Sequence, residues 1–259
     1  MITAGVDAGN KYTRVVILKD GQVLAKGEVV SGFNQQKAAD DSFNLALQEA
    51  GLSKENVNYV IATGAGKTEV AFSNSNITDL TAATKGAKFI CPTARFVVDV
   101  GAEESRVAKI DKDGRVVDFA VNEKCAAGAG SFVEAMSRAL EIPIEQMGEL
   151  SLQSTKTVQI NAQCAVFAES EVVSLIHANT AKKDIAKAVN DAMASRIMSM
   201  VRRVGVEKNL VIIGGMANNR GFVKSMEDGL EMKVVLPAEP NFVGALGAAV
   251  VAAEKALNV

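Results

Sequence analysis

The sequence lacks several features that mark specialised classes of protein. Its 259 residues include no tryptophan, four prolines, three cysteines and one histidine. No run of about 18 apolar residues occurs, so we expect a protein that does not span a membrane. Three cysteines, an odd number, behind an N-terminus without a secretory signal argue against a disulfide framework. We therefore expect a reducing, cytoplasmic setting.

The charges exclude a further class of function. The 28 lysines and arginines stand against 30 aspartates and glutamates, for a formal net charge of −2. The sequence therefore has no excess of positive charge that would predict binding to nucleic acid or to an anionic membrane. What the chain has in quantity is glycine, with 21 residues, and hydrophobic side chains, at 48%. This composition suits an α/β protein with many tight turns, of one large domain or two lobes.

Two segments of the chain repeat each other. "DAGNKYTRV", from Asp7, and "DVGAEESRV", from Asp99, share Asp, Gly, Arg and Val at identical spacing. Each is followed by two β-rich runs joined by a Lys-Asp-Gly turn, which is a strong hairpin signal. The shared hairpin favours an internal duplication. We predict two related lobes, residues 1–94 and 95–259, with the C-terminal helix packing back towards the first lobe.

Each repeat places an Asp-x-Gly turn between two strands. Glycine lets the backbone approach a ligand closely, and exposed N–H groups in such turns bind anions. An aspartate at a strand end can hold Mg²⁺ directly or through water. Two such turns facing each other would form a nucleotide cleft between lobes. The alternative is that Asp7 and Asp99 only cap ordinary hairpin turns.

Further glycine-rich turns follow two other predicted strands. "TGAGKTEV", from Thr63, resembles a P-loop but has Ile61 where that motif requires its first glycine. We therefore predict a simple strand-to-helix turn there. The pair Gly214-Gly215 in "GGMANN" suits either contact with a flat or anionic ligand or tight packing of a strand on a helix. Residues 241–257, rich in small side chains, predict a closely packed helix.

Two cysteines stand where helices are expected to begin. Cys125 precedes a helix predicted near Gly130, and Cys164 precedes another. Helix N-termini lower the pKa of a thiol and favour metal ligation or nucleophilic chemistry. The apolar positions that predict these helices are Phe132, Val133, Met136, Ala139 and Leu140 after the first thiol, and Phe167, Val172, Leu175 and Ile176 after the second.

Two thiols in one chain are too few for a metal centre of four protein ligands, as tetrahedral zinc and iron–sulfur clusters require. A site on a two-fold axis between two chains would supply four. From the residues alone, two thiols without a metal are as consistent with the sequence as a shared metal site. We interpret Cys91 as a buried structural residue and His177 as a helix-surface or packing residue.

The two cysteine motifs carry a family resemblance. "NEKCAAGAGSF" and "CAVFAESEVVS" closely resemble signatures of the ATP-dependent activators of 2-hydroxyacyl-CoA dehydratases, a family that includes ATPase subunits of benzoyl-CoA reductase. The resemblance runs from "GVDAG" to "GALGAAV". It implies an actin-like ATPase fold of two RNase H-like lobes, with ATP or ADP and Mg²⁺ in a cleft between them. It also implies one [4Fe–4S] cluster, bound by Cys125 and Cys164 of each of two chains.

The resemblance further implies partners and a reaction. Members couple ATP hydrolysis to transfer of one low-potential electron to a CoA-thioester dehydratase or reductase in anaerobic metabolism. The chain would form a homodimer or pair with a homologous subunit, and ferredoxin or flavodoxin would supply the electron. The residues carried over comprise a catalytic set, Asp7, Asp99 and Glu103, and a nucleotide-binding set, Gly9, Asn10, Lys11, Gly101, Ala102, Gly214, Gly215 and Asn219.

The chain departs from the family pattern at several positions. Asn10 and Lys11 replace a Ser-Thr pair at the first turn. Glu103 replaces a glutamine thought to orient the attacking water, which bears on the hydrolysis rate more than on binding. Ala82 and Ala83 replace a Cys-His pair common in the activators. These changes favour the reductase-subunit branch. A small-molecule kinase of the same fold and a non-redox assembly ATPase remain as alternatives.

Overall fold

The computed structural model describes residues 1–122, 128–161 and 164–257. The chain forms two compact units that are not continuous in sequence, whereas the predicted lobes are. Unit 1 comprises Met1–Arg95, Ile110–Val117 and Asn241–Val259, and unit 2 comprises Phe96–Lys109 and Asp118–Pro240.

Unit 1 is built on a mixed five-stranded sheet of order β3-β2-β1-β4-β5. Strand β1 pairs antiparallel with β2 and parallel with β4. The turn between β2 and β3 is formed by Asp20 and Gly21, both at positive φ, which confirms the predicted Asp-Gly hairpin. The strands are β1 (Ile2–Ala8), β2 (Tyr12–Lys19), β3 (Gln22–Val30), β4 (Tyr59–Thr63) and β5 (Ser75–Asn76).

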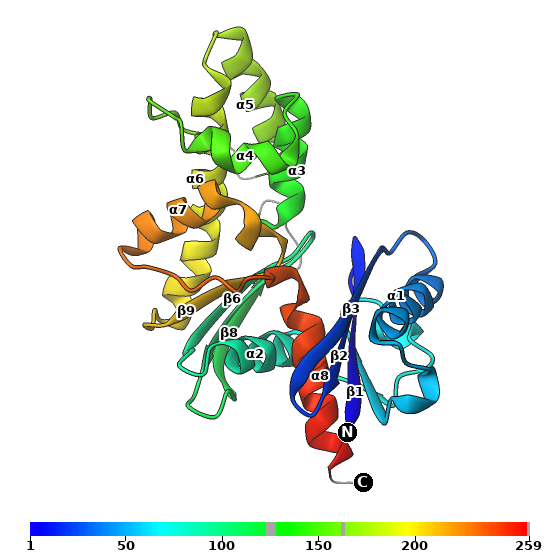
Figure 1. Ribbon diagram of the computed structural model, residues 1–259. Helices are drawn as coiled ribbons and strands as arrows, with labels where there is room; N and C mark the ends of the chain where they lie inside the picture. Colours follow the sequence, from blue (N-terminus) through cyan, green and yellow to red (C-terminus); the bar gives the residue numbers. More distant parts are fainter. Residues whose placement is uncertain (123–127, 162–163, 258–259) are drawn as a thin grey trace. The chain divides into compact units, whose positions relative to one another are not determined.

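Helices cover both faces of this sheet. Alternate residues of β2 point to opposite sides: Ile17 joins a core with Phe43 of α1 (Gln35–Ala50), and Val16 joins a core with Leu246 of α8 (Val243–Ala256). Figure 1 shows α1 and α8 on opposite sides of β1–β3. Gly51 caps the C-terminus of α1 in the left-handed conformation, at φ 65°.

Small residues let α8 lie unusually close to its neighbours. A Cβ built on Gly5 of β1 would collide with the carbonyl oxygen of Ala245. One built on Gly247 would collide with the carbonyl oxygen of Ala82 and lie 2.7 Å from the nitrogen of Gly86, both in α2 (Asp79–Ile90). The small residues predicted to pack closely therefore do so.

Unit 2 repeats the order of unit 1. Its sheet runs β8-β7-β6-β9, with β6 antiparallel to β7 and parallel to β9. An isolated parallel bridge between Val211 and Val235 lies beside β9, at the place that β5 holds in unit 1. The predicted duplication is thus visible in the topology. The strands are β6 (Phe96–Val100), β7 (Ser105–Ile110), β8 (Val116–Asn122) and β9 (Leu210–Ile213).

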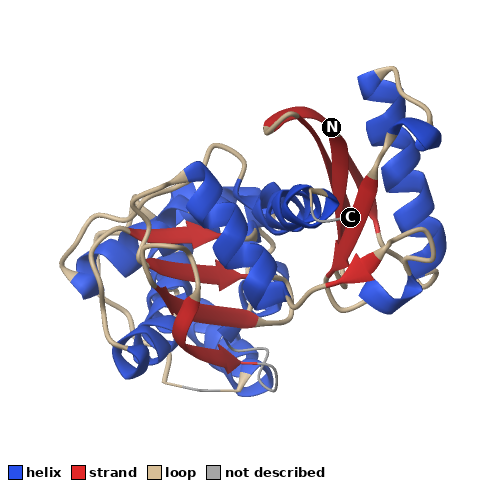
Figure 2. Cartoon of the chain, turned by 90° about the horizontal axis from the view of Figure 1, so that it is seen from below, coloured by secondary structure: helices blue, strands red, loops and turns tan. Residues whose placement is uncertain are grey.

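Five helices complete unit 2 around one large core that includes Phe132, Met136 and Phe222. As predicted, α3 begins at Gly130 and α5 directly after Cys164. Figure 2 shows the strands in red with helices in blue packed against them. No helix in the described part of the chain is long and apolar enough to span a membrane. The helices are α3 (Gly130–Ala139), α4 (Ile144–Ser151), α5 (Ala165–His177), α6 (Lys182–Val204) and α7 (Arg220–Leu230).

Candidate functional site

Asp7 is the second-last residue of β1 and lies close to two glycines from other elements. It pairs in parallel register with Thr63, the last residue of β4. A Cβ on Gly64 would lie 2.7 Å from Oδ1 of Asp7, and a Cβ on Gly244 would lie 2.7 Å from Oδ2. Gly244 belongs to the first turn of α8, where the helix dipole stabilises a carboxylate. The carboxylate is therefore placed by two glycines that the sequence motif around Asp7 does not contain.

A buried hydroxyl fixes the backbone of this first turn. Ser31, between β3 and α1, donates from Oγ to the carbonyl of Gly9 at 2.6 Å and from its backbone nitrogen to the carbonyl of Lys11 at 3.0 Å. Its Oγ also lies 2.9 Å from the buried Thr13 Oγ1. The side chains of Asn10 and Lys11 are exposed. Ser31 thus fixes the backbone of the turn, while the side chains of Asn10 and Lys11 are exposed to solvent.

The glycine-rich turn after β4 packs against the end of β1. Gly66 donates from its nitrogen to the carbonyl of Ala8 at 2.9 Å. Lys67 begins a short 3₁₀ helix, and its Nζ lies 3.4 Å from the carbonyl oxygen of Gly64 and 3.7 Å from Oδ2 of Asp79. The segment is the predicted strand-to-helix turn, and its lysine faces Asp79.

The second turn begins at Asp99, the counterpart of Asp7 in β6. Arg106, directly across the ladder, places Nη1 3.5 Å from Oδ2 of Asp99 and also forms an ion pair with Glu104. Glu103 is exposed at the tip of the turn. Arg14, in the same register in unit 1, pairs with Glu28 instead. The equivalent arginines of the two repeats thus have different ion-pair partners.

The second turn is joined to the start of α3. Gly130 donates from its nitrogen to the carbonyl of Gly101 at 2.9 Å, and Ser131 donates to the carbonyl of Ala102 at 2.8 Å. These N–H groups belong to the first helical turn, where the helix offers them no partner. The peptide units expected to contact phosphate are therefore bonded to the helix that begins five residues after Cys125.

Gly64 and Gly214 are equivalent in the two repeats. Each follows the strand parallel to that of the aspartate, at φ 90° and 83°. A Cβ on Gly214 would lie 2.8 Å from Oδ1 of Asp99, as one on Gly64 would crowd Asp7. The sequence predicted Gly214 as a nucleotide contact and did not predict Gly64. The missed signal was the glycine that directly follows the predicted strand in both "VIATG" and "LVIIG".

The other predicted contacts of the "GGMANN" segment differ in their surroundings. Around Gly215 a Cβ would meet no atom within 4 Å, so this position is open to a ligand. Asn219 caps α7: its Oδ1 accepts from the nitrogen of Phe222 at 3.0 Å, and its Nδ2 donates to Oδ1 of the buried Asn190 at 3.0 Å. Its side chain therefore holds the helix that follows the glycine pair.

The thiol of Cys164 is exposed at the N-terminus of α5 and makes no capping hydrogen bond to that helix. Its predicted companion, Cys125, lies outside the described residues. No group of three or more metal-ligating side chains occurs in the part of the chain that the structure describes. A soft, accessible thiol is the kind of ligand that iron–sulfur clusters take, so Cys164 fits that group.

Three further expectations about this region have clear outcomes. Phe167 was predicted on the apolar face of α5, but it is 69% exposed, because Ala168 and Val172 form the buried side. Cys91 is half-buried rather than buried, because it caps the C-terminus of α2, with Sγ 3.4 Å from Oγ1 of Thr93. His177 is exposed at the end of α5, as predicted.

Comparison with known proteins shows the family. The profile of the BadF/BadG/BcrA/BcrD ATPase family matches residues 4–252. The chain belongs to this ATPase family. Among its relatives in the BadF/BadG/BcrA/BcrD family, the activator of lactoyl-CoA dehydratase from Anaerotignum propionicum is 37% identical over 99% of this chain and 99% of the relative.

Two solved structures extend the likeness to three dimensions. Component A of the (R)-2-hydroxyglutaryl-CoA dehydratase of Acidaminococcus fermentans matches with a TM-score of 0.96 and 35% identity, covering 99% of each chain. The activator of the 2-hydroxyisocaproyl-CoA dehydratase from Clostridium difficile, with bound ADPNP, matches with a TM-score of 0.94 and 33% identity, covering 100% of this chain and 96% of the other. The expected actin-like ATPase fold is confirmed.

The relatives in the BadF/BadG/BcrA/BcrD family include both dehydratase activators and a reductase subunit. A benzoyl-CoA reductase subunit from Thauera aromatica is 30% identical over 96% of this chain and 92% of the relative. The dehydratase activators match with 34% and 37% identity, and the expectation of the reductase-subunit branch stays a prediction.

Proposed function

We propose that this chain is the ATP-hydrolysing activator of a CoA-thioester dehydratase or reductase, to which it passes one low-potential electron. The observation that carries the proposal is the likeness, along the whole chain, to a dehydratase activator with bound ADPNP. The two aspartate turns supply the residue types that nucleotide binding needs, and Cys164 supplies an accessible thiol.

The two turns both contribute to ATP and Mg²⁺ binding in this proposal. Gly9 and Gly101 let the backbone of each turn approach phosphate, and Asp7 and Asp99 orient the cation. Asp99 faces the guanidinium of Arg106, whose positive charge competes with a metal ion. The remaining proposed contacts are Asn10, Lys11, Ala102, Gly214, Gly215 and Asn219.

Hydrolysis transfers the γ-phosphoryl group of ATP to water, giving ADP and phosphate. Positioning and charge stabilisation dominate such a step, and little covalent chemistry is asked of the protein. Glu103 lies exposed on the second turn and would accept a hydrogen bond from the attacking water. Because a carboxylate can only accept, it orients water through one hydrogen and adds negative charge near the phosphate. We expect a slow ATPase with ordinary nucleotide affinity.

Cys125 and Cys164 of two chains would hold one [4Fe–4S] cluster. When bound, the cluster supplies storage and release of a single electron. The chain couples this site to the nucleotide through α3, because Gly130 and Ser131 at its start are bonded to Gly101 and Ala102. A turn that moves when nucleotide binds therefore moves this helix. ATP shifts the position of the turn and of α3 only because it binds one of their two positions more tightly than the other.

The partners follow from the same proposal. A homodimer, or a pair with a homologous subunit, completes the four thiols. A ferredoxin or flavodoxin reduces the pair in the cytoplasm of an anaerobic cell, and the reduced pair donates to the CoA-thioester enzyme.

Anaerobic purification tests the proposal directly. We expect a brown dimer with about four iron and four sulfide per two chains, a slow ATPase, and loss of iron in Cys164→Ala and Cys125→Ala. An iron-free wild-type protein with full ATPase activity would favour a non-redox assembly ATPase instead. Phosphorylation of a sugar or acid by an iron-free protein would favour the kinase.

A further inference from the structure

A segment without regular structure ends three residues before Cys164 in the described part of the chain. Residues 152–161 follow α4 and contain neither helix nor strand. Two carboxylates bind this segment, one near its start and one at its end. Asp184 of α6 holds the start, and Glu171 of α5 holds the end.

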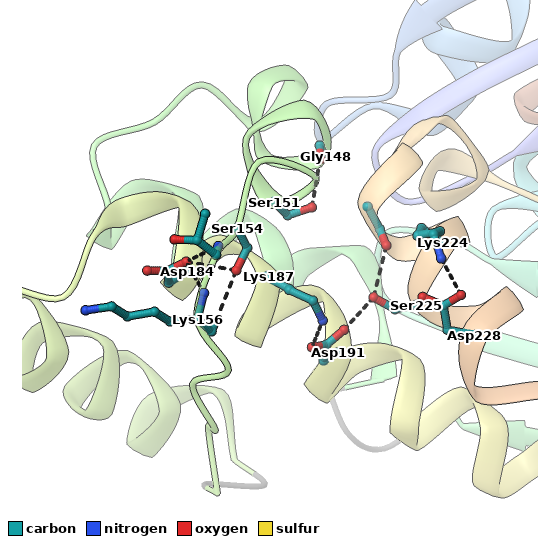
Figure 3. Close-up of polar contacts among 12 residues, drawn as sticks. Gly148, Ser151, Ser154, Lys156, Asp184, Lys187, Asp191, Lys224, Ser225 and Asp228 are labelled. Carbon is teal, nitrogen blue, oxygen red and sulfur yellow. Dashed lines mark hydrogen bonds and ion pairs between the residues drawn. The ribbon is translucent and has the colours of Figure 1, made fainter.

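Asp184 is buried and binds three donors through one oxygen. Its Oδ1 accepts from Ser154 Oγ at 2.8 Å, from the nitrogen of Thr155 at 2.9 Å and from the nitrogen of Lys156 at 3.1 Å. Figure 3 shows this carboxylate pointing at Ser154 and Lys156. This contact lies eight or more residues before the thiol, so it anchors the segment without reaching Cys164.

Glu171 binds the other end of the segment. The nitrogen of Asn161 lies 3.2 Å from its Oε1 and 3.1 Å from its Oε2, and Asn161 Nδ2 donates to Oε1 at 3.3 Å. Asn161 stands three residues before Cys164, and Glu171 stands seven after it, about two helical turns along α5. The contact therefore joins the chain on both sides of the thiol.

This contact restrains where the thiol can lie. Three residues span at most about 11 Å, so fixing Asn161 against α5 limits the space open to the chain that enters Cys164. A ligand held in place before metal arrives loses less conformational entropy on binding. Two of the three hydrogen bonds come from a backbone N–H, so the restraint depends on Glu171 more than on the side chain at 161.

We propose that Glu171 is a positioning residue for Cys164, acting through the backbone of Asn161. The proposal rests on the proposed function only in taking Cys164 as a cluster ligand. An effect of the position of Glu171 and an effect of its charge predict different results for Glu171→Gln. A negative charge near a thiol opposes the thiolate, so an effect of charge would appear equally in Glu171→Gln and Glu171→Ala. An effect of position would be preserved in Glu171→Gln, whose amide oxygen still accepts from Asn161.

The first experiment uses the intact protein without metal. Iodoacetamide alkylation of each cysteine is followed by peptide mass spectrometry, with Cys91 as the internal reference. We expect Glu171→Ala to raise the Cys164 rate, relative to Cys91, by about 3- to 10-fold, the range for losing one to two hydrogen bonds. Glu171→Gln should stay near the wild-type ratio. Asp184→Asn is the matched control at the far end of the segment and should leave the ratio unchanged.

The second experiment follows iron in the reconstituted dimer. The half-life of iron release to a chelator should fall in Glu171→Ala and recover in Glu171→Gln, by factors that parallel the thiol ratios. Thermal unfolding checks that each variant folds. If Glu171→Ala does not fold, Asn161→Pro removes the backbone donor from the other side of the contact and should give the same rise in the Cys164 rate.

The outcomes separate the two proposals. A wild-type alkylation ratio in Glu171→Ala, or an equal change in Glu171→Ala and Glu171→Gln, would overturn the positioning role. Failure of the wild-type protein to take up iron would overturn the proposed function and leave the alkylation result to decide on Glu171.

Discussion

At the scale of single residues, the aspartates are placed by glycines that lie far from them in sequence. Gly64 combines φ 90° with a Cβ position 2.7 Å from Oδ1 of Asp7. Gly64→Ala should therefore strain the backbone and displace the carboxylate. We expect a loss of about 1–3 kcal/mol in the free energy of unfolding and at least a tenfold weaker Mg²⁺-dependent affinity for an ATP analogue, measured by calorimetry.

Gly51→Ala is the matched control for this variant. Gly51 also has positive φ, 65°, but a Cβ there would meet nothing within 4 Å. It should lower stability through backbone strain alone and leave Mg²⁺-dependent affinity at the wild-type value. Equal affinities in the two variants would contradict the role assigned to Gly64.

Residues differ in how well the sequence predicts their roles. The two Asp-x-Gly turns were predictable because the same residues occur twice in the sequence at the same spacing. Ser31 was not, because its hydroxyl acts on Gly9 across a strand pairing that only the fold creates. Phe167 was misplaced because it lies five residues from Val172, so the two side chains lie on different sides of α5. Tertiary packing buries the side that carries Val172.

At the scale of elements, two backbone hydrogen bonds join α3 to the second turn, and in the proposed function they couple the nucleotide to the thiols. Ser131→Pro removes the donor to Ala102, and proline is tolerated in the first turn of a helix. We expect a protein that folds normally but in which an ATP analogue no longer changes the alkylation rate of Cys125. Ser131→Ala keeps the N–H group and should respond as the wild type does. An unchanged response in Ser131→Pro would remove this route of coupling.

The connection between α4 and α5 gives a pH dependence. The backbone N–H of Thr155, with Ser154 Oγ and the N–H of Lys156, lowers the pKa of Asp184 from its ordinary value, against the effect of burial. A lowered pKa in the folded state means that this contribution to stability is complete above the unfolded pKa, about 3.9. It is lost as the pH falls below that value and passes through the folded pKa.

Asp184→Asn tests that sign. Asparagine keeps an acceptor oxygen but does not titrate, so the variant should be less stable than the wild type at neutral pH. The difference in urea midpoint should shrink as the pH falls from about 5 towards 3. A difference that stays constant over this range would show that ionisation of Asp184 contributes nothing.

At the scale of the whole molecule, unit 1 is closed by the end of the chain. The predicted boundary between residues 94 and 95 follows the repeat, yet Ile110–Val117 and Asn241–Val259 belong to unit 1. The return of the last helix was predicted, and its small residues predicted only that it would pack closely. The return of residues 110–117 was not, because a hairpin tip carries no sequence signal for the surface on which it packs.

The closing helix makes a sharp prediction about stability. α8 lies so close to β1 that a Cβ on Gly5 would collide with the carbonyl oxygen of Ala245, and Thr3 Oγ1 donates to the carbonyl of Ala249 at 3.2 Å. Gly5→Ala must push helix and strand apart and open the core of Val16 and Leu246. Such overpacking costs about 1–3 kcal/mol, which urea unfolding would measure.

Gly215→Ala is the control for that experiment, because its Cβ would enter open space at ordinary φ. Its free energy of unfolding should match the wild type to within about 0.5 kcal/mol. If Gly5→Ala unfolded at the same urea concentration as this control, α8 would have to yield without cost. Its close approach to β1 would then be an incidental fit, and the small residues of the last helix would need another explanation.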